Sequence, residues 1–150
     1  MQLFTIHSVK NRAFTLIELL VVIGVVLLMI VGLTPFVQMT RERAHRINCA
    51  NNLRQISIGL HTYAVDHNDA FPATLGALYP NYVDDEKAFD CPSSKTIGTH
   101  ISPDYSYTTG LTETASPKDI IAQDANGNHK KAGKNVLKVN GSVEWASSRR

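Results

Sequence analysis

The hydrophobic and polar positions divide the chain into two unlike parts. Every one of residues 19–33 is apolar or glycine, and residues 19–40 contain no charged side chain. This uncharged run has about the length that a helix needs to cross a bilayer, roughly 20 residues. The chain after residue 40 has the polar composition of a folded domain in water.

The polar part begins with a helical pattern. Apolar side chains recur at roughly helical spacing across residues 41–65, at Ala44, Ile47, Leu53, Ile56, Leu60 and Tyr63. This predicts an amphipathic helix with one apolar face. We expect it to end near residues 66–69, ahead of Phe71-Pro72, because the residue before a proline disfavours helical backbone. Residues 14–65 would then form one long helix, loosened or kinked at Pro35, which lacks a backbone donor.

The remaining residues predict loops and small elements. A helical turn and two short strands are expected at residues 74–79, 101–108 and 120–122. The clearest signal is a hairpin, in which the β-rich runs 135–139 and 142–145 flank the turn Asn140-Gly141. The predicted fold class is therefore α+β: a long N-terminal α-helix, membrane-spanning in its first half and amphipathic in its second half, packed against a small C-terminal antiparallel β head.

Three interpretations compete for residues 1–40. A secretory signal would need a small-x-small cleavage site after its apolar stretch, and Gly32-Leu33-Thr34 does not supply one. A plain transmembrane anchor fits the length and the basic flank of Lys10 and Arg12, which places the N-terminus in the cytoplasm. It leaves Glu18 unexplained, because an acid at the entrance of an apolar helix is costly.

The third interpretation accounts for these residues together. The segment Lys10-Asn11-Arg12-Ala13-Phe14-Thr15-Leu16-Ile17-Glu18 closely resembles the processing site of type IV prepilins and type II secretion pseudopilins. The resemblance implies that a prepilin peptidase removes residues 1–13 by cutting between Ala13 and Phe14, and that Phe14 is then N-methylated. Glu18 becomes the fifth residue of the product, where the family has its glutamate, and Pro35 lies where many members have a proline. Ala13 departs from the glycine that is commoner before the cut.

The physical role of Glu18 can be argued separately. A carboxylate at membrane depth needs a partner. Cleavage before Phe14 would create a positive α-amino group, and in a staggered fibre Glu18 of one copy can meet the Phe14 amine of another. Such a buried pair sets register better than it adds stability. The alternative is that Glu18 reaches to the membrane interface.

The head also resembles a family. The segments 49–56 and 89–93, together with His129 and the closing Asn140-Gly141 hairpin, look like a large bacterial group of pseudopilin-like proteins, in which a His precedes Asp-Gly by about ten residues. Asn140 replaces that Asp, which a turn accepts. Cys49 and Cys91 are more often paired than free in a small exported domain, and the alternative is two buried thiols.

Other candidate chemistry is weaker. Asp124, Asn126 and Asn128 resemble part of a calcium loop but lack its closing glutamate, so calcium is only a secondary hypothesis and no other cofactor is expected. A second group dense in metal-ligand residue types, at the predicted helix end, is more simply a helix cap; it contains His61, Asp66, His67 and Asp69. No nucleophile setting or phosphate loop indicates an enzyme. The basic tail lacks the interleaved aromatics of a nucleic-acid site, so no nucleic-acid partner is expected.

The sequence therefore predicts a structural subunit, a pseudopilin of a type II secretion pseudopilus or of a type IV pilus-like filament. Its expected parts are a leader (1–13), a transmembrane and filament-core helix (14–40), an amphipathic helix of the head (41–69) and a loop-rich β head (70–150). Its expected partners are prepilin peptidase/methyltransferase, copies of itself, other pseudopilins and the bacterial inner membrane. The expected topology is single-pass, with a cytoplasmic N-terminus and a periplasmic head that later joins an extracytoplasmic filament. The alternative is a membrane-tethered periplasmic binding module that does not polymerise.

Overall fold

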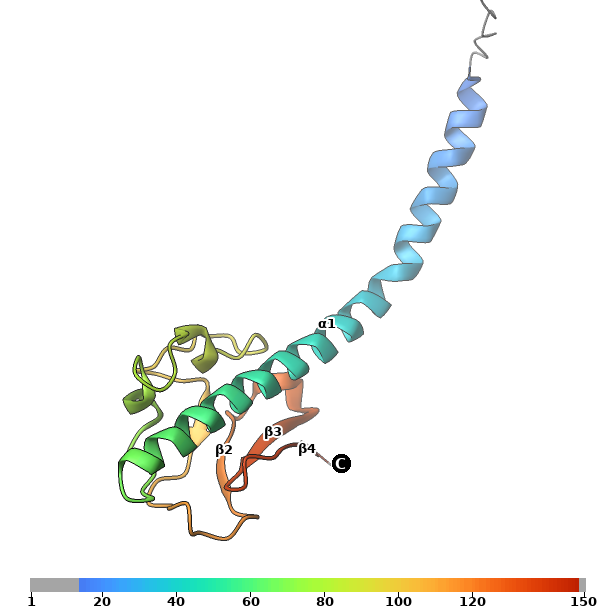
Figure 1. Cartoon of the computed structure of the whole chain (residues 1–150). Coiled ribbons are helices and arrows are strands. Elements are labelled where there is room, and N and C mark those ends of the chain that lie inside the picture. Colours follow the sequence, from blue (N-terminus) through green and yellow to red (C-terminus); the bar gives the residue numbers. More distant parts are fainter. Residues whose placement is uncertain (1–13, 149–150) are drawn as a thin grey trace, which may run out of the picture. The chain divides into compact units, whose positions relative to one another are not determined.

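The chain falls into two compact units, Met1–Gln38 and Met39–Arg150, and the second unit is called the head below. The computed structural model describes residues 14–148, apart from the side chains of residues 33–36, 130 and 131. One helix of 51 residues, α1 (Leu16–Asp66), belongs to both units (Figure 1). The predicted leader, residues 1–13, lies outside the described residues.

The first turn of α1 is set by Thr15. Its carbonyl accepts the amide of Leu19 at 3.2 Å, and its hydroxyl accepts the amide of Glu18 at 3.3 Å. This is the geometry of an N-cap, which satisfies one of the amides that lack a partner at a helix start. The pattern Thr-x-x-Glu is the sequence signature of such a start.

No single helix among the described residues is long and apolar enough by itself to cross a membrane. The segments Leu16–Gly32 and Val37–Asp66 pass together as a broken pair, by length and composition only.

The head is built on a four-stranded antiparallel sheet in the order β1-β2-β3-β4. Its strands are β1 (Tyr105–Tyr107), β2 (Ile120–Asp124), β3 (Gly133–Lys138) and β4 (Val143–Ser147). The second half of α1 packs on this sheet, as its ribbon in front of β2 and β3 indicates (Figure 1). Three 3-10 turns complete the head: η1 (Leu75–Leu78), η2 (Glu86–Phe89) and η3 (Asn128–Lys131).

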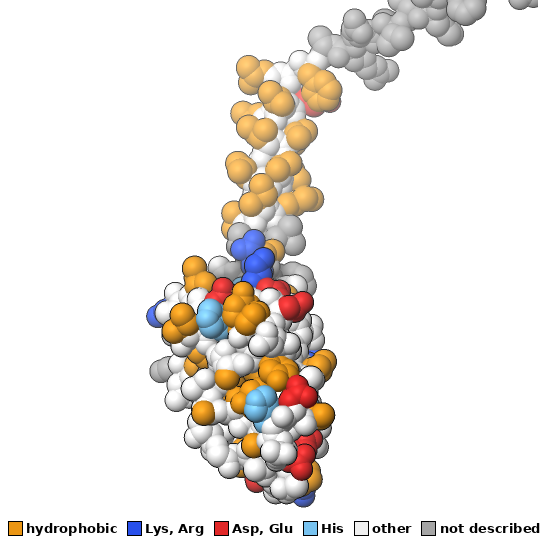
Figure 2. Space-filling model, turned by 60° about the vertical axis from the view of Figure 1, so that its left-hand side comes forward, with side chains coloured by type: hydrophobic (Ala, Val, Ile, Leu, Met, Phe, Trp, Pro, Cys, Tyr) orange, Lys and Arg blue, Asp and Glu red, His pale blue; other side chains and the backbone are white. Residues whose placement is uncertain are grey.

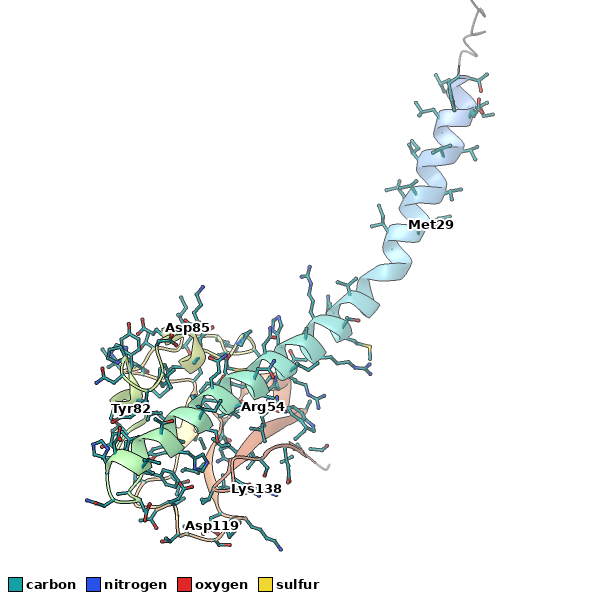
Figure 3. All side chains as sticks on the ribbon, in the orientation of Figure 1. Met29, Arg54, Tyr82, Asp85, Asp119 and Lys138 are labelled. Carbon is teal, nitrogen blue, oxygen red and sulfur yellow. A yellow bond between two sulfur atoms is a disulfide. The ribbon has the colours of Figure 1, made fainter. Side chains whose placement is uncertain are left out.

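The buried face of α1 in the head follows a strict helical spacing. The residues on it are Cys49, Leu53, Ile56, Leu60 and Ala64, each at most 1% exposed. Leu75, Phe89, Ile121 and Leu137 cover this face from the turns and the sheet. The end of α1 is held by the hydroxyl of Tyr82, which donates to Asp66 Oδ2 at 3.1 Å (Figure 3).

The predicted α+β fold class is confirmed. The helix ends at Asp66, and β3 and β4 form the predicted hairpin around Asn140-Gly141. Gly141 has φ = 79°, and Asn140 Oδ1 accepts the Ser142 amide at 3.0 Å, which explains these turn residues. The prediction was wrong for Ala44, which is exposed, and for Ile47, which is 61% exposed, because both lie off the buried face.

Candidate functional site

The predicted processing site lies at the start of the described chain. The side chain of Phe14 is 74% exposed, and Phe14 precedes the N-cap Thr15. Ala13 lies outside the described residues, so the cleavage and methylation sites stay predictions.

Glu18 lies in the first turn of α1, one turn after Phe14. A negative side chain here is favourable because the free amides at a helix start carry partial positive charge. Its predicted role in register concerns another copy and stays a prediction. The side chain of Pro35 is outside the described set, so the predicted kink also stays a prediction.

The first half of α1 presents an apolar surface on all sides. Every described side chain from Phe14 to Gly32 is exposed within the chain. Hydrophobic side chains accordingly line the visible face of the helix of the first unit (Figure 2). Exposed apolar surface on this scale marks a site of contact with a membrane or with other proteins.

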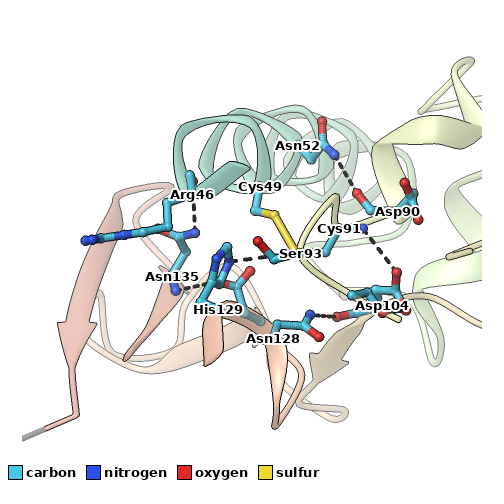
Figure 4. The surroundings of a disulfide bond; sticks show 12 residues. Arg46, Cys49, Asn52, Asp90, Cys91, Ser93, Asp104, Asn128, His129 and Asn135 are labelled. Carbon is cyan, nitrogen blue, oxygen red and sulfur yellow. Dashed lines mark hydrogen bonds and ion pairs between the residues drawn. A yellow bond between two sulfur atoms is a disulfide. The ribbon is translucent and has the colours of Figure 1, made fainter. Parts of the chain in front are cut away.

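The head contains a buried group of reactive side chains, which we call the buried cluster: Cys49, Cys91, Asp124 and His129 (Figure 4). Cys49 in α1 forms a disulfide with Cys91 in the loop after η2, with Cα atoms 5.4 Å apart. The predicted pairing of the two cysteines is confirmed. The bond fastens the loop to α1 across 42 residues of sequence.

His129 connects the disulfide to two carboxylates. Its Nδ1 lies 2.8 Å from Glu42 Oε1, and its Nε2 lies 3.1 Å from Asp124 Oδ2 and 3.7 Å from Cys91 Sγ. Burial by itself lowers the pKa of His129, but hydrogen bonds and attraction from Asp124 and Glu42 outweigh burial and raise it above its ordinary value. The ring, with no exposed surface, therefore joins α1 to the end of β2 through its two nitrogens.

Neighbouring side chains hold this bridge in place. The Ser93 hydroxyl donates to both oxygens of Glu42, at 3.1 and 3.2 Å. The backbone amide of Asn135 donates to Asp124 Oδ2 at 2.6 Å, and the side-chain amide of Asn135 donates to the backbone carbonyl of Arg46. The guanidinium of Arg46 lies 3.4 Å from the ring centroid of Trp145, which also contacts His129 edge-on. The helix and the sheet are thus joined by polar contacts as well as by the apolar core.

The residues of the calcium hypothesis have separate contacts. Asp124 is buried against His129, Asn128 donates to the Asp104 carbonyl at 3.2 Å, and Asn126 is exposed. Calcium binding by these residues stays a prediction. At the helix end, His61 pairs with Glu113 and His67 stacks on Tyr63, so the structure does not bring that histidine pair together.

Sequence reasoning missed the role of Glu42. It is the one acid among Arg41, Arg43 and Arg46, which is a weak signal that it faces inward. His129 was noted only as half of a motif with Asn140-Gly141, yet the structure places these at opposite ends of β3. His129 has φ = 58°, a strained value that its contacts to Glu42 and Asp124 support.

A groove lies between α1 and the loop after η2. It has a volume of about 710 Å³ and is lined by amide side chains of α1, opposite Lys87, Asp90 and Ile97. Those amides are Asn48, Asn51, Asn52 and Gln55. The groove could hold a polar ligand or a segment of another chain.

Two families of known proteins match the chain. Residues 9–34 match the family described as "Prokaryotic N-terminal methylation motif". Residues 38–87 match the family described as "Protein of unknown function (DUF1559)". Neither the comparison with curated proteins nor the comparison with solved structures gives a match. The first match covers the predicted processing site, and the second begins where the head begins.

Proposed function

We propose that the chain is a prepilin-like structural protein, and that it serves as a pseudopilin in a type II secretion pseudopilus or a related type IV pilus-like filament. The methylation motif at residues 9–34 carries this proposal. Such a motif implies processing by prepilin peptidase and assembly like that of a pilin. The choice of a pseudopilin rests on the short head and its closing hairpin, which resemble that branch.

The exposed apolar half of α1 supports assembly. Its side chains are apolar on all sides, so they need cover from lipid or from the helices of other subunits. A helix that first anchors the chain in the membrane and later enters a filament core would be covered first by lipid and then by the helices of other subunits. The head, which contains its own core, would lie on the outside of the filament.

Glu18 is the residue that we assign to assembly. After cleavage, the α-amino group of Phe14 in one copy would meet the Glu18 carboxylate of the next. Because an unpaired charge among packed apolar helices costs several kcal/mol, only a stagger that pairs the two groups is favourable. The pair would therefore fix the register between neighbouring subunits.

The proposed location follows from the same segment. Lys10 and Arg12 would keep the leader in the cytoplasm, and the head would fold in the periplasm after the helix inserts as a single span. The Cys49–Cys91 disulfide supports this location, because disulfides persist in oxidising compartments. Prepilin peptidase, further copies of the chain and other pseudopilins would be its partners.

A membrane-tethered binding module is the second candidate, favoured by the amide-lined groove beside α1. In that case the head would bind its ligand as a monomer. Glu18 would then have no partner chain, and its removal would leave function intact.

The variant Glu18→Val in the native host tests the two candidates. Filaments sheared from cells should fall at least tenfold, while the variant remains in the membrane fraction in unchanged amount. Leu19→Val is the matched control, since it changes a neighbouring side chain without removing charge, and it should assemble normally. Normal assembly of Glu18→Val would overturn the role of Glu18 in register. Failure of the unmodified chain to form filaments would instead favour the binding module.

A further inference from the structure

The buried cluster contains the donor atoms of a transition-metal site. The sulfurs of Cys49 and Cys91, a carboxylate oxygen of Asp124 and a ring nitrogen of His129 all lie within 4.8 Å of one another. All four residues are buried. Two sulfurs, one imidazole and one carboxylate are the ligand types that proteins use for zinc.

The contacts of Asp124 are a second, independent observation that points to a bound cation. Its Oδ2 accepts the Asn135 amide and contacts His129, but its Oδ1 is buried without a hydrogen-bond partner among the described residues. A buried carboxylate oxygen without a partner is costly and uncommon in native proteins. A cation bound by the cluster would give this carboxylate a partner.

We propose that reduction of the Cys49–Cys91 disulfide converts the buried cluster into a site for one divalent transition-metal ion of zinc-like chemistry. The ligands are the two thiolates, Nε2 of His129 and the carboxylate of Asp124. Ligands of tetrahedral zinc, at ~2.0–2.3 Å from the ion, lie roughly 3.3–3.8 Å from one another. The separations from His129 Nε2 to Asp124 Oδ2 and to Cys91 Sγ, 3.1 and 3.7 Å, are already close to this range.

Glu42 would orient His129 without binding the metal itself. Metal-bound histidines usually give their second ring N–H to a carboxylate, which fixes the tautomer and the orientation of the ring. Glu42 Oε1 lies 2.8 Å from His129 Nδ1, and Ser93 orients the Glu42 carboxylate. Nε2 of His129 is thereby left to face the sulfurs.

The conversion balances with a thiol or phosphine as reductant. The disulfide takes up two electrons and two protons, the reductant is oxidised, and Cys49 and Cys91 become thiols. Binding of the divalent ion then releases the thiol protons, and Nε2 of His129 gives up its proton as it binds the metal. A small-molecule disulfide reverses the sequence: it takes up the two electrons and two protons and becomes two thiols, while Cys49 and Cys91 re-form their bond and release the ion. The disulfide and the metal are therefore alternative states of one site.

The disulfide state and the metal-bound state would both cross-link α1 to the loop after η2. The disulfide links α1 to the loop after η2. The metal would link α1 and this loop to β2 and η3 as well, through Asp124 and His129. A head whose thiols are not yet oxidised would therefore still have a cross-link at its centre, because binding to a preformed site stabilises the folded state.

The test uses the full chain in detergent, reduced with a phosphine and freed of it under inert gas. Zinc per chain is measured by atomic emission, and cobalt is used as a spectroscopic probe. We expect roughly one zinc per reduced chain, thiolate-to-cobalt charge-transfer bands, and near-ultraviolet circular dichroism typical of the folded head. The oxidised chain, and Cys49→Ser/Cys91→Ser, should bind at least tenfold less.

Glu42→Gln and Glu113→Gln form a matched pair of variants. Each removes a carboxylate that lies 2.8 Å from a histidine Nδ1, but only Glu42 faces the buried cluster. Glu42→Gln should weaken zinc binding about 10- to 100-fold while preserving the thiolate bands, and Glu113→Gln should leave the affinity unchanged.

Three results would overturn the proposal. A folded, reduced chain that binds less than about a fifth of an equivalent of zinc would show that the cluster is no metal site. Equal binding by the oxidised chain would exclude the thiolates as ligands, as would a cobalt spectrum without thiolate bands. Loss of the folded circular dichroism on reduction, without recovery on adding zinc, would show that the site does not survive opening of the disulfide.

Discussion

The two halves of α1, one in each unit of the chain, bury their apolar side chains in different ways. In the first half, every described side chain up to Gly32 is exposed within the chain, although nearly all are apolar. In the second half, Cys49, Leu53 and Ile56 are covered by the sheet and turns of the same chain. The apolar side chains of the first half therefore need lipid or other chains to cover them, whereas those of the second half are covered by the head of the same chain.

This contrast explains their different composition. A helix surrounded by lipid or by identical helices needs apolar residues on every side. A helix on the surface of a small domain needs them on one stripe, and polar residues such as Arg54 occupy the rest. Substitutions should thus have opposite consequences in the two halves.

The largest expected effect is on the stability of the head. Ile56→Ala removes a side chain with no exposed surface and should lower the free energy of unfolding by roughly 3–4 kcal/mol, from lost burial and a cavity. Ile58→Ala is the matched control, because Ile58 is 68% exposed and its loss should cost less than about 0.5 kcal/mol. Urea unfolding of the full chain in detergent, followed by Trp145 fluorescence, measures both. Equal losses would contradict the assignment of the buried face.

A charge in the first half should act on membrane association instead. Val25→Asp places a carboxylate in the apolar segment and should cost about 3 kcal/mol of insertion free energy, while the unfolding of the head stays unchanged. Extraction of membranes at alkaline pH measures the fraction retained. Ile58→Asp, in the head, should be retained like the unmodified chain. The contrast between the halves would fail if the two variants were extracted alike.

The smallest effect concerns the helix start. Thr15→Ala removes the hydroxyl that accepts the Glu18 amide and should destabilise the first turn by about 1 kcal/mol. Hydrogen exchange at the Glu18 amide should become about fivefold faster. Thr62→Ala, which removes a hydroxyl bonded to the Ile58 carbonyl inside the helix, should leave Glu18 unaffected. An unchanged exchange rate at Glu18 in Thr15→Ala would show that Thr15 is not the cap.

The sequence was informative where local patterns determine structure. The uncharged run and the helical spacing after residue 40 predicted α1, and Asn140-Gly141 predicted the hairpin because few residues accept the backbone angles of such a turn. The processing motif was equally readable, since its residues occur in fixed order. The disulfide remained open, because pairing depends on the distance between segments that only the fold brings together.

The contacts of the buried cluster could not be predicted for the same reason. Glu42 and His129 are 87 residues apart, and nothing near either residue indicates its partner. The oxygen-rich pattern around Asp124 suggested a calcium loop, yet that side chain is turned into the core toward His129. Local pattern shows which residue types are present, whereas packing decides which of them meet.

Processing as a prepilin would give this chain a new, methylated N-terminus at Phe14. The mass of the N-terminal peptide from the membrane fraction of the native host shows whether this occurs. We expect a peptide that begins at Phe14 and is heavier by one methyl group. An intact terminus at Met1, in cells with active prepilin peptidase, would contradict it and leave a plain membrane anchor.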